Sequence, residues 1–163
     1  MNDYIIRLAT EADASQIAEI YNPYIATTVS FEETPVSDVE MACRIKEFGS
    51  IYPYFVAERD GKVIGYCYAH PWKERKSFSP TAETSVYVRQ GEESAGVGRV
   101  LMEHLIEGCR QNGCHVLIAC ITAENVGSIR FHERLGFKVV SHFEEVGFKF
   151  NRWLDVCDMQ LTL

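Results

Sequence analysis

Residues 83–99 read ETSVYVRQGEESAGVGR, and this stretch decides the fold. Val86 and Val88 share one face of a predicted strand, and after a polar loop Gly96 and Gly98 open an amphipathic run typical of a helix. The first amides of a helix have no intrahelical partner and lie at its positive dipole end, so such a junction can bind a pyrophosphate. A tight strand-to-helix connection without a ligand is an equally good interpretation of these residues.

Composition indicates one domain over residues 1–163, because 47% of the residues are hydrophobic and can fill a core. The formal net charge of -7 and the lack of a basic run with aromatics argue against a nucleic-acid partner. No apolar stretch approaches the roughly 18 residues that span a bilayer, and the N-terminal residues lack the apolar segment of a signal peptide. We therefore expect a cytoplasmic protein without a membrane partner.

The six cysteines are scattered and lack the paired C-x2-C spacing of a zinc site. In the cytoplasm such residues stay reduced, so we expect thiols in the core and no metal.

Strand and helix patterns alternate along the chain, which predicts an α/β layer on one sheet. The Asp60-Gly61 dipeptide predicts a hairpin turn, and Thr10 and Ser37 are predicted caps of the first two helices. The predicted strands are residues 4–8, 51–58, 62–68, 81–88, 115–122, 137–147 and 152–162. The predicted helices extend from Thr10 to about Tyr24 and over 37–48, 96–111 and 126–135.

Several strings along nearly the whole chain resemble the GNAT superfamily of N-acetyltransferases, in particular its phosphinothricin and methionine sulfoximine acetyltransferase branch. The matching strings are YNPYI, TVSF, YFVAE, DGKVIGY, PWK, TAETSVYV, G-x-G, N-x-x-S-x-x-x-HE-x-LGF and GFK, in the family's order and spacing. The resemblance implies a single GNAT domain with a mixed, splayed sheet of about seven strands and flanking helices in three layers. It also implies acetyl-CoA as the donor, and usually a homodimer.

The same resemblance assigns residues to acetyl-CoA. The pantetheine arm would pair with the main chain of the strand at Val86, Tyr87 and Val88. The pyrophosphate would meet the amides of Glu93, Ser94, Ala95, Gly96, Val97 and Gly98. Asn125 and Ser128 share a predicted helix face toward the pantetheine.

One departure from the family pattern is Glu93, which stands where Gln or Arg is usual, next to Glu92. Two carboxylates beside a dianion should weaken binding unless Arg89 or Arg99 offsets them. We favour the alternative in which Glu93 points outward into solvent.

Acetyl transfer to an amine requires a base, because an α-ammonium group is protonated near neutral pH. The resemblance assigns this role to Glu83, whose pKa would be raised if the carboxyl group is buried against the sheet. A strand-end glutamate in solvent is the alternative. His132 stands where many family members use Tyr to protonate the leaving thiolate, and imidazole could donate that proton. A histidine that is only hydrogen-bonded at the edge of the cofactor is an equally good interpretation.

Substrate recognition is expected in the segments before the cofactor motif. In PWKERKSF, Lys73 and Arg75 are predicted to alternate on one side of an extended stretch and to bind a carboxylate or phosphinate. An ordinary solvated loop is the alternative. Phe31 and Trp72 are the predicted apolar wall, and Gly147, Phe148 and Lys149 are predicted to close the pocket, from this subunit or from a partner. His70 is predicted to be structural.

Three functions fit these observations. The first is N-acetylation of the α-amine of a small amino acid such as phosphinothricin, methionine sulfoximine or methionine sulfone, by direct transfer with Glu83 as base. The second is acetylation of protein N-termini or lysines, and the third is a non-catalytic acyl-CoA sensor. The PWKER loop favours a closed pocket for an anionic group, and therefore the first function.

Overall fold

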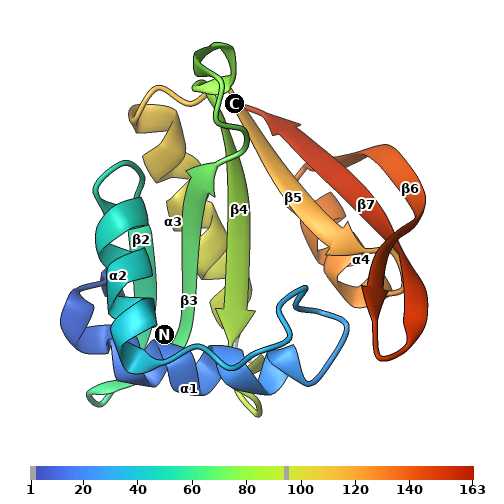
Figure 1. Ribbon diagram of the computed structural model, residues 1–163. Coiled ribbons are helices and arrows are strands. Elements are labelled where there is room, and N and C mark those ends of the chain that lie inside the picture. Colours follow the sequence, from blue (N-terminus) through green and yellow to red (C-terminus); the bar gives the residue numbers. More distant parts are fainter. Residues whose placement is uncertain (1–2, 94–95) are drawn as a thin grey trace.

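The computed structural model describes residues 3–93 and 96–163 (Figure 1). Its strands are β1 (Ile5–Leu8), β2 (Tyr54–Arg59), β3 (Lys62–Pro71), β4 (Thr81–Val88), β5 (Val116–Thr122), β6 (Lys138–Lys149) and β7 (Arg152–Thr162). Its helices are α1 (Ala14–Ile25), α2 (Asp38–Gly49), α3 (Val97–Gln111) and α4 (Val126–Arg134), with short 3-10 turns at Glu11–Asp13 and Lys76–Phe78. No helix in these two ranges is long and apolar enough to cross a membrane.

The seven strands form one mixed sheet in the order β1-β2-β3-β4-β5-β7-β6. Only the β4–β5 pair is parallel, and it is short, because the register runs from Thr81 opposite Val116 to Glu83 opposite Ile118 and then stops. Beyond Glu83 the two strands diverge, as Figure 1 shows between the green and the orange arrows. The predicted mixed, splayed sheet is confirmed.

Helices cover both faces of the sheet, which confirms the three predicted layers (Figure 1). α1 and α2 bury an apolar cluster with Tyr54, Val56 and Tyr66 on one face. α3 and α4 pack on the other, where Leu101 and Leu105 are fully buried. Burial of each such side chain is worth about 1.5–3 kcal/mol, so the core holds the three layers together.

Local signals explain most element boundaries. The Ser37 side chain accepts a hydrogen bond from the Glu40 amide at 3.1 Å and starts α2, as predicted. Asp60 and Gly61 both have positive φ, 51° and 78°, which is the turn geometry that the hairpin requires. Thr10 forms the predicted cap, but the 3-10 turn comes first, so α1 itself begins at Ala14.

The segment after β3 differs from the sequence prediction. The PWKERKSF segment is not an extended stretch, because β3 ends at Pro71 and an irregular loop then leads into the 3-10 turn.

The cysteines are mostly core residues as predicted, since Cys67, Cys109, Cys114 and Cys157 are buried, whereas Cys43 is exposed on α2.

Candidate active site

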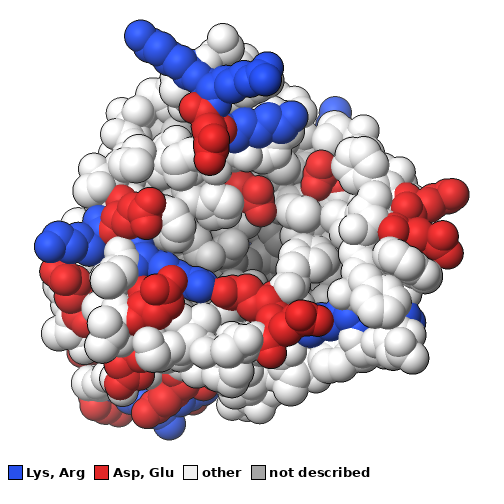
Figure 2. Space-filling view, in the orientation of Figure 1, with Lys and Arg blue, Asp and Glu red and all other residues white. Residues whose placement is uncertain are grey.

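The divergence of β4 from β5 opens a cleft of about 430 Å³, measured to its open mouth. Figure 2 shows a hollow in this face of the molecule, with acidic groups around it. Its lining includes five residues that the sequence assigned to the cofactor or to catalysis: Val86, Tyr87, Asn125, Ser128 and His132.

Main-chain groups of β4 face this cleft. The Arg89 amide donates to the Ile64 carbonyl of β3 at 2.8 Å, and antiparallel pairing alternates, so the main-chain groups of Val86 and Val88 point away from β3. The Val88 carbonyl accepts a hydrogen bond from the Tyr24 hydroxyl at 2.6 Å. On the side away from β3, Val86 has no partner in β5 within the described sheet, so its N–H and C=O can pair with an extended ligand.

The two glycines at the start of α3 have separate roles. Gly96 caps the helix with φ of 70°, a left-handed conformation that glycine adopts without strain. A Cβ atom at Gly98 would lie 3.4 Å from Val88 and 3.7 Å from Phe131, which are ordinary contacts, so the packing of α3 against β4 and α4 does not itself require glycine there. Val97 is fully buried, which leaves only its main chain for a ligand. Ser94 and Ala95 lie outside the described residues.

The two glutamates before α3 are held apart from each other. Glu92 forms an ion pair with Arg59 of β2 at 2.6 Å, an interaction that the sequence did not suggest because 33 residues separate the pair. Glu93 is exposed, as we favoured, and accepts a hydrogen bond from the Gly91 amide at 2.8 Å.

The two arginines that were expected to offset these charges do not pair with them. Arg89 binds Glu19 of α1 at 3.4 Å, and Arg99 binds Glu103 of α3 at 2.8 Å. Among the described residues, Arg59 therefore compensates the charge of Glu92, and the charge of Glu93 has no ion-pair partner.

Glu83 lies where β4 and β5 separate, opposite Ile118 on β5 and His70 on β3. Its side chain is 27% exposed, which excludes the fully solvated alternative. Burial raises the pKa of the Glu83 carboxyl group, nearby His70 lowers it, and the Asp158 charge raises it. A carboxylate with a raised pKa is suited to accept a proton near neutral pH.

His132 is buried and its protonation is constrained by its contacts. Its Nδ1 lies 2.8 Å from the Ser128 carbonyl, which can only accept, so Nδ1 carries a hydrogen and the neutral ring has its lone pair on Nε2. Burial lowers the pKa of His132. To act as an acid the ring must first gain a second proton, which burial disfavours, so this geometry suits an acceptor or a cleft wall better than a proton donor.

Asn125 begins α4. Its side-chain oxygen accepts a hydrogen bond from the Ser128 amide at 3.2 Å, and its amide group lines the cleft. Both positions agree with the predicted helix face, since Asn125, Ser128 and His132 all reach the same cleft.

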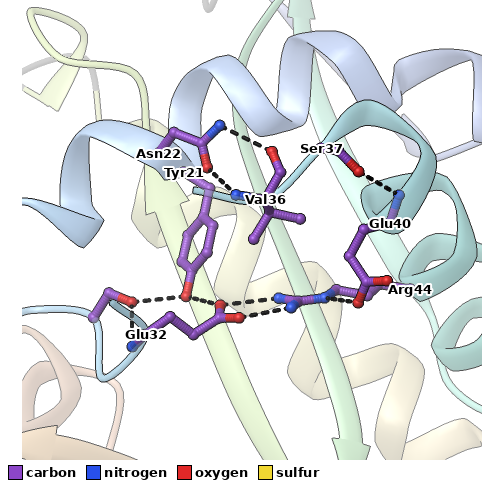
Figure 3. Close-up of polar contacts among 8 residues, drawn as sticks. Tyr21, Asn22, Glu32, Val36, Ser37, Glu40 and Arg44 are labelled. Atoms are coloured by element: carbon purple, nitrogen blue, oxygen red, sulfur yellow. Dashed lines mark hydrogen bonds and ion pairs between the residues drawn. The ribbon is translucent and has the colours of Figure 1, made fainter. Parts of the chain in front are cut away.

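A polar network fixes the segment between α1 and α2 (Figure 3). Arg44 binds both oxygens of Glu32, at 2.9 and 2.6 Å, and Tyr21 donates a hydrogen bond to the same carboxylate. The Arg44 guanidinium is the largest cause of a lowered Glu32 pKa. Asn22 and Val36 exchange two hydrogen bonds, at 3.0 and 2.8 Å, which anchor the end of the segment. Tyr21 and Asn22 belong to the YNPYI string, but the sequence patterns assign no role to the network.

The predicted substrate residues lie in separate segments. Trp72 contacts Phe78 edge-on at 5.4 Å, and the Lys73 ammonium lies 4.1 Å above the Trp72 ring. Arg75 is exposed and makes no ion pair with a described residue. Phe31 is exposed in the segment after α1, which Figure 1 shows at the opposite end of β3 from the loop that carries Trp72. Phe31 and Trp72 therefore do not form one continuous wall.

Lys149 has a different role from the predicted one. Its ammonium group donates to the carbonyls of Ile25, Thr27 and Ser30 at 2.8, 2.7 and 2.7 Å, and the residue is 4% exposed. All three of its protons are used, so the ammonium group holds the segment after α1 in place and has no donor left for a ligand. Phe148 is exposed and packs on Trp153 with ring centroids 4.8 Å apart. Gly147 is partly buried opposite Leu154 of β7.

Comparison with known proteins identifies a family that matches this chain. Residues 6–157 match the family described as acetyltransferase (GNAT) domain. The L-methionine sulfoximine/L-methionine sulfone acetyltransferase of Salmonella typhimurium is 39% identical over 160 residues, which cover 97% of this chain and 94% of that protein.

Two solved structures are similar over nearly the full length. A phosphinothricin acetyltransferase from Sinorhizobium meliloti, in complex with acetyl-CoA, has a TM-score of 0.93 at 36% identity and covers 99% of this chain and 89% of its own. A ribosomal-protein-alanine N-acetyltransferase from Brucella melitensis has a TM-score of 0.94 at 38% identity and covers 98% of this chain and 99% of its own. The splayed sheet, the cleft along β4 and these matches agree, and the chain belongs to the GNAT family of acetyltransferases.

Proposed function

We propose that this chain transfers the acetyl group of acetyl-CoA directly to the α-amine of a small amino acid, with Glu83 as the general base. The observation that carries the proposal is the position of Glu83. Its partly buried carboxyl group lies where β4 and β5 separate, one residue before Thr84, where the β4 lining of the cleft begins, and farther along the strand Val86 offers main-chain groups without a β5 partner.

The chain's own groups suit acetyl-CoA, which supplies an activated acetyl thioester. The Val86 N–H and C=O would hold the pantetheine arm as an added strand, and the Asn125 amide would contact it from α4. The free amides at the start of α3, beginning at Gly96, would bind the pyrophosphate. Because these contacts use main-chain groups, they are compatible with the outward Glu93.

Glu83 would accept the proton that the substrate ammonium must lose before its nitrogen can attack. Burial and the Asp158 charge both raise the Glu83 pKa, so the carboxylate binds a proton more readily than a solvated glutamate.

Direct transfer is favoured over an acyl-cysteine intermediate. Cys120 lines the cleft, but burial, with the charges of Glu83 and Asp158, raises its pKa to about 12. Since the thiolate is the nucleophilic form, Cys120 stays protonated and unreactive near neutral pH.

The amino acid class rests on the named relatives and on the free cation at Arg75. The relatives act, by name, on methionine sulfoximine, methionine sulfone and phosphinothricin, which share an α-amine and a carboxylate with a tetrahedral polar group. An unpaired Arg75 guanidinium can bind such an anionic group with two hydrogen bonds.

Arg75→Ala tests this recognition. Loss of a charged hydrogen bond costs about 1.5–3 kcal/mol, so KM for a carboxylate-bearing amine should rise by about tenfold to a hundredfold. The same reaction with an amine that lacks the carboxylate should be unaffected, and Lys76→Ala provides a matched loss of charge in the adjacent turn. An unchanged KM would move recognition of the anionic group away from Arg75.

A second function is favoured by one observation, the similarity to the ribosomal-protein-alanine N-acetyltransferase. Thiol release from acetyl-CoA separates the two functions when methionine sulfoximine, methionine sulfone, phosphinothricin, common amino acids and alanine-starting peptides are compared. The six protein thiols must be subtracted in a blank without amine. Turnover confined to the small amino acids supports the first function, whereas turnover confined to peptides replaces it with the second.

We also propose that the protein is a homodimer that pairs through the β6–β7 hairpin. Several large apolar side chains are exposed there, which is costly for a monomer: Val139, Val140, Phe143, Val146, Phe148 and Trp153. Light scattering should give twice the chain mass, and Val140→Glu should reduce it to that of one chain. A monomeric wild-type protein would exclude the dimer.

A further inference from the structure

His70 is the direct cross-strand neighbour of Glu83, in a register that pairs β3 with β4. Its Nε2 lies 3.7 Å from the nearer Glu83 carboxylate oxygen. The other ring nitrogen, Nδ1, lies 3.0 Å from the Pro71 carbonyl, which can only accept a hydrogen bond. Nδ1 therefore carries a hydrogen, and the nitrogen directed at Glu83 is the one that bears the lone pair of the neutral ring.

The ring is held in this orientation by aromatic neighbours. Phe48 of α2 lies 5.5 Å from the His70 ring and Tyr68 of β3 lies 6.0 Å from it, between ring centroids. Phe48 and Tyr68 also stack on each other at 5.6 Å. The His70 side chain is nevertheless 26% exposed, so a proton on it can reach solvent.

The remaining groups around Glu83 carry no positive charge. Asp158 of β7 and Cys120 of β5 interact with it electrostatically, and so does Tyr68 of β3. Among the described residues, the ion pairs of Glu83 include no lysine or arginine, and His70 is the partner that can become positive. At 3.7 Å the two atoms are too far apart for a direct hydrogen bond, and a proton would pass between them through a bridging water.

We propose that His70 is a positioning residue that acts through Glu83, accepting a proton from it through a bridging water and passing the substrate's proton on to solvent. This inference rests on the proposed function of Glu83 as base. The proton leaves the substrate ammonium for a Glu83 oxygen, then passes through one water molecule to His70 Nε2, and the resulting imidazolium loses it to solvent. The carboxylate is restored, charge is conserved at each transfer, and no oxidant or reductant is needed.

The inference predicts a change in pH dependence with a definite sign. A positive His70 lowers the Glu83 pKa, so removal of the ring leaves burial and Asp158 to raise that pKa unopposed. The acidic limb of kcat/KM should then move to higher pH. In His70→Gln, kcat/KM should fall by about threefold or more near pH 6 and change less near pH 8.5.

A matched control is available on α3. His104 is an exposed histidine whose Nδ1 also donates to a main-chain carbonyl, that of Val100 at 2.8 Å, and its ring packs edge-on against Phe55. It has no carboxylate partner among the described ion pairs. His104→Gln should therefore keep the wild-type pH profile.

The experiment measures kcat/KM from about pH 5.5 to 9 for the wild type, His70→Gln, His104→Gln and Glu83→Gln, with folding checked by circular dichroism. His70→Ala is assayed near pH 6 with and without added imidazole. Recovery of activity by imidazole, absent in His104→Ala, is expected for a missing proton carrier and not for a missing structural side chain.

The outcomes separate this inference from the proposed function. A His70→Gln profile that superimposes on the wild type, or a His70→Ala loss that imidazole does not repair, overturns the role of His70. An active Glu83→Gln enzyme overturns Glu83 as base and the His70 inference with it. An inactive Glu83→Gln together with a shifted His70→Gln profile supports both.

Discussion

Glu32 and Glu83 are two partly buried carboxylates of similar exposure, 36% and 27%, in opposite electrostatic settings. Glu32 is bound at both oxygens by Arg44 and by Tyr21, and Arg44 lowers its pKa (Figure 3). Among the described residues, the ion-pair partner of Glu83 is His70, at 3.7 Å, and burial raises the Glu83 pKa. The protein thus favours the charged form of Glu32 and makes Glu83 more ready to take up a proton.

This difference distinguishes a glutamate that stabilises the fold from one that is suited to proton transfer. A carboxylate that is paired and hydrogen-bonded contributes to shape, and it cannot act as a base because its charge is already satisfied. A buried and poorly paired carboxylate costs stability, and its presence where β4 and β5 separate, next to the cleft, is expected if catalysis needs it.

Glu83→Gln should have the largest effect. Because a base is lost and the side-chain volume is kept, kcat should fall by about 10²-fold or more. Binding of acetyl-CoA, measured by calorimetry, should stay close to that of the wild type, since the expected contacts are made by main-chain groups along β4 and α3.

The thermal stability of Glu83→Gln also tests the comparison between Glu83 and Glu32. Removal of an unpaired, partly buried charge should leave the melting temperature at least as high as in the wild type near neutral pH. A Glu83→Gln protein that is active, or that melts well below the wild type, would mean that Glu83 is a structural residue like Glu32.

The sequence predicted the elements well because they depend on local patterns. The Ser37 cap, the Asp60-Gly61 turn and the alternation of β4 each act within a few residues, and the structure confirms them. The residues of β4 and α4 that line the cleft could be singled out from the family motifs, which also follow the local order of the chain.

The rest of the site depends on contacts between distant segments. His70 was interpreted as structural because strand register, which sets it opposite Glu83, cannot be read from one sequence. Lys149 was assigned to the substrate, but its carbonyl partners lie 119 to 124 residues away. The network of Arg44 likewise joins α2 to the segment after α1.

Lys149→Met should have the next largest effect, on the structural side of the comparison. The change keeps an unbranched apolar stem and removes three hydrogen bonds to carbonyls at the end of α1. Charged hydrogen bonds contribute more to stability than neutral ones, and a cation is also stabilised at the negative end of a helix. The free energy of unfolding should therefore fall by about 2 kcal/mol.

Lys138→Met is the matched control for this change, because Lys138 is exposed on the same strand and should be replaced at little cost. Urea denaturation of both variants measures the difference. Equal stability of the two would show that the segment after α1 does not depend on the Lys149 ammonium.

Arg44→Ala should destabilise the protein by about 1–2 kcal/mol, because it leaves the Glu32 carboxylate partly buried without its bidentate partner. Solvent screens both partly exposed side chains, which keeps this cost moderate. Arg99→Ala breaks an exposed pair with Glu103 on α3 and should have a much smaller effect. If the two variants are equally stable, the Glu32 network does not hold the fold.

The smallest effect, a pair of opposite pH dependences, sharpens the comparison most. The folded Glu32 pKa is lowered, so its contribution is present above the unfolded value of 4.5 and is lost as pH falls through the folded pKa. The stability difference between the wild type and Arg44→Ala should therefore shrink in acid.

The folded Glu83 pKa is raised, so its contribution is present below the unfolded value of 4.5 and is lost as pH rises through the folded pKa. Stability of Glu83→Gln relative to the wild type should therefore increase as pH rises through this window. Unfolding curves of the three proteins at a series of pH values measure both slopes. Slopes of the same sign would contradict the assignment of one glutamate to the fold and the other to proton transfer. Only where the fold disfavours ionisation of a carboxyl group does the protein gain stability when that group is made permanently neutral.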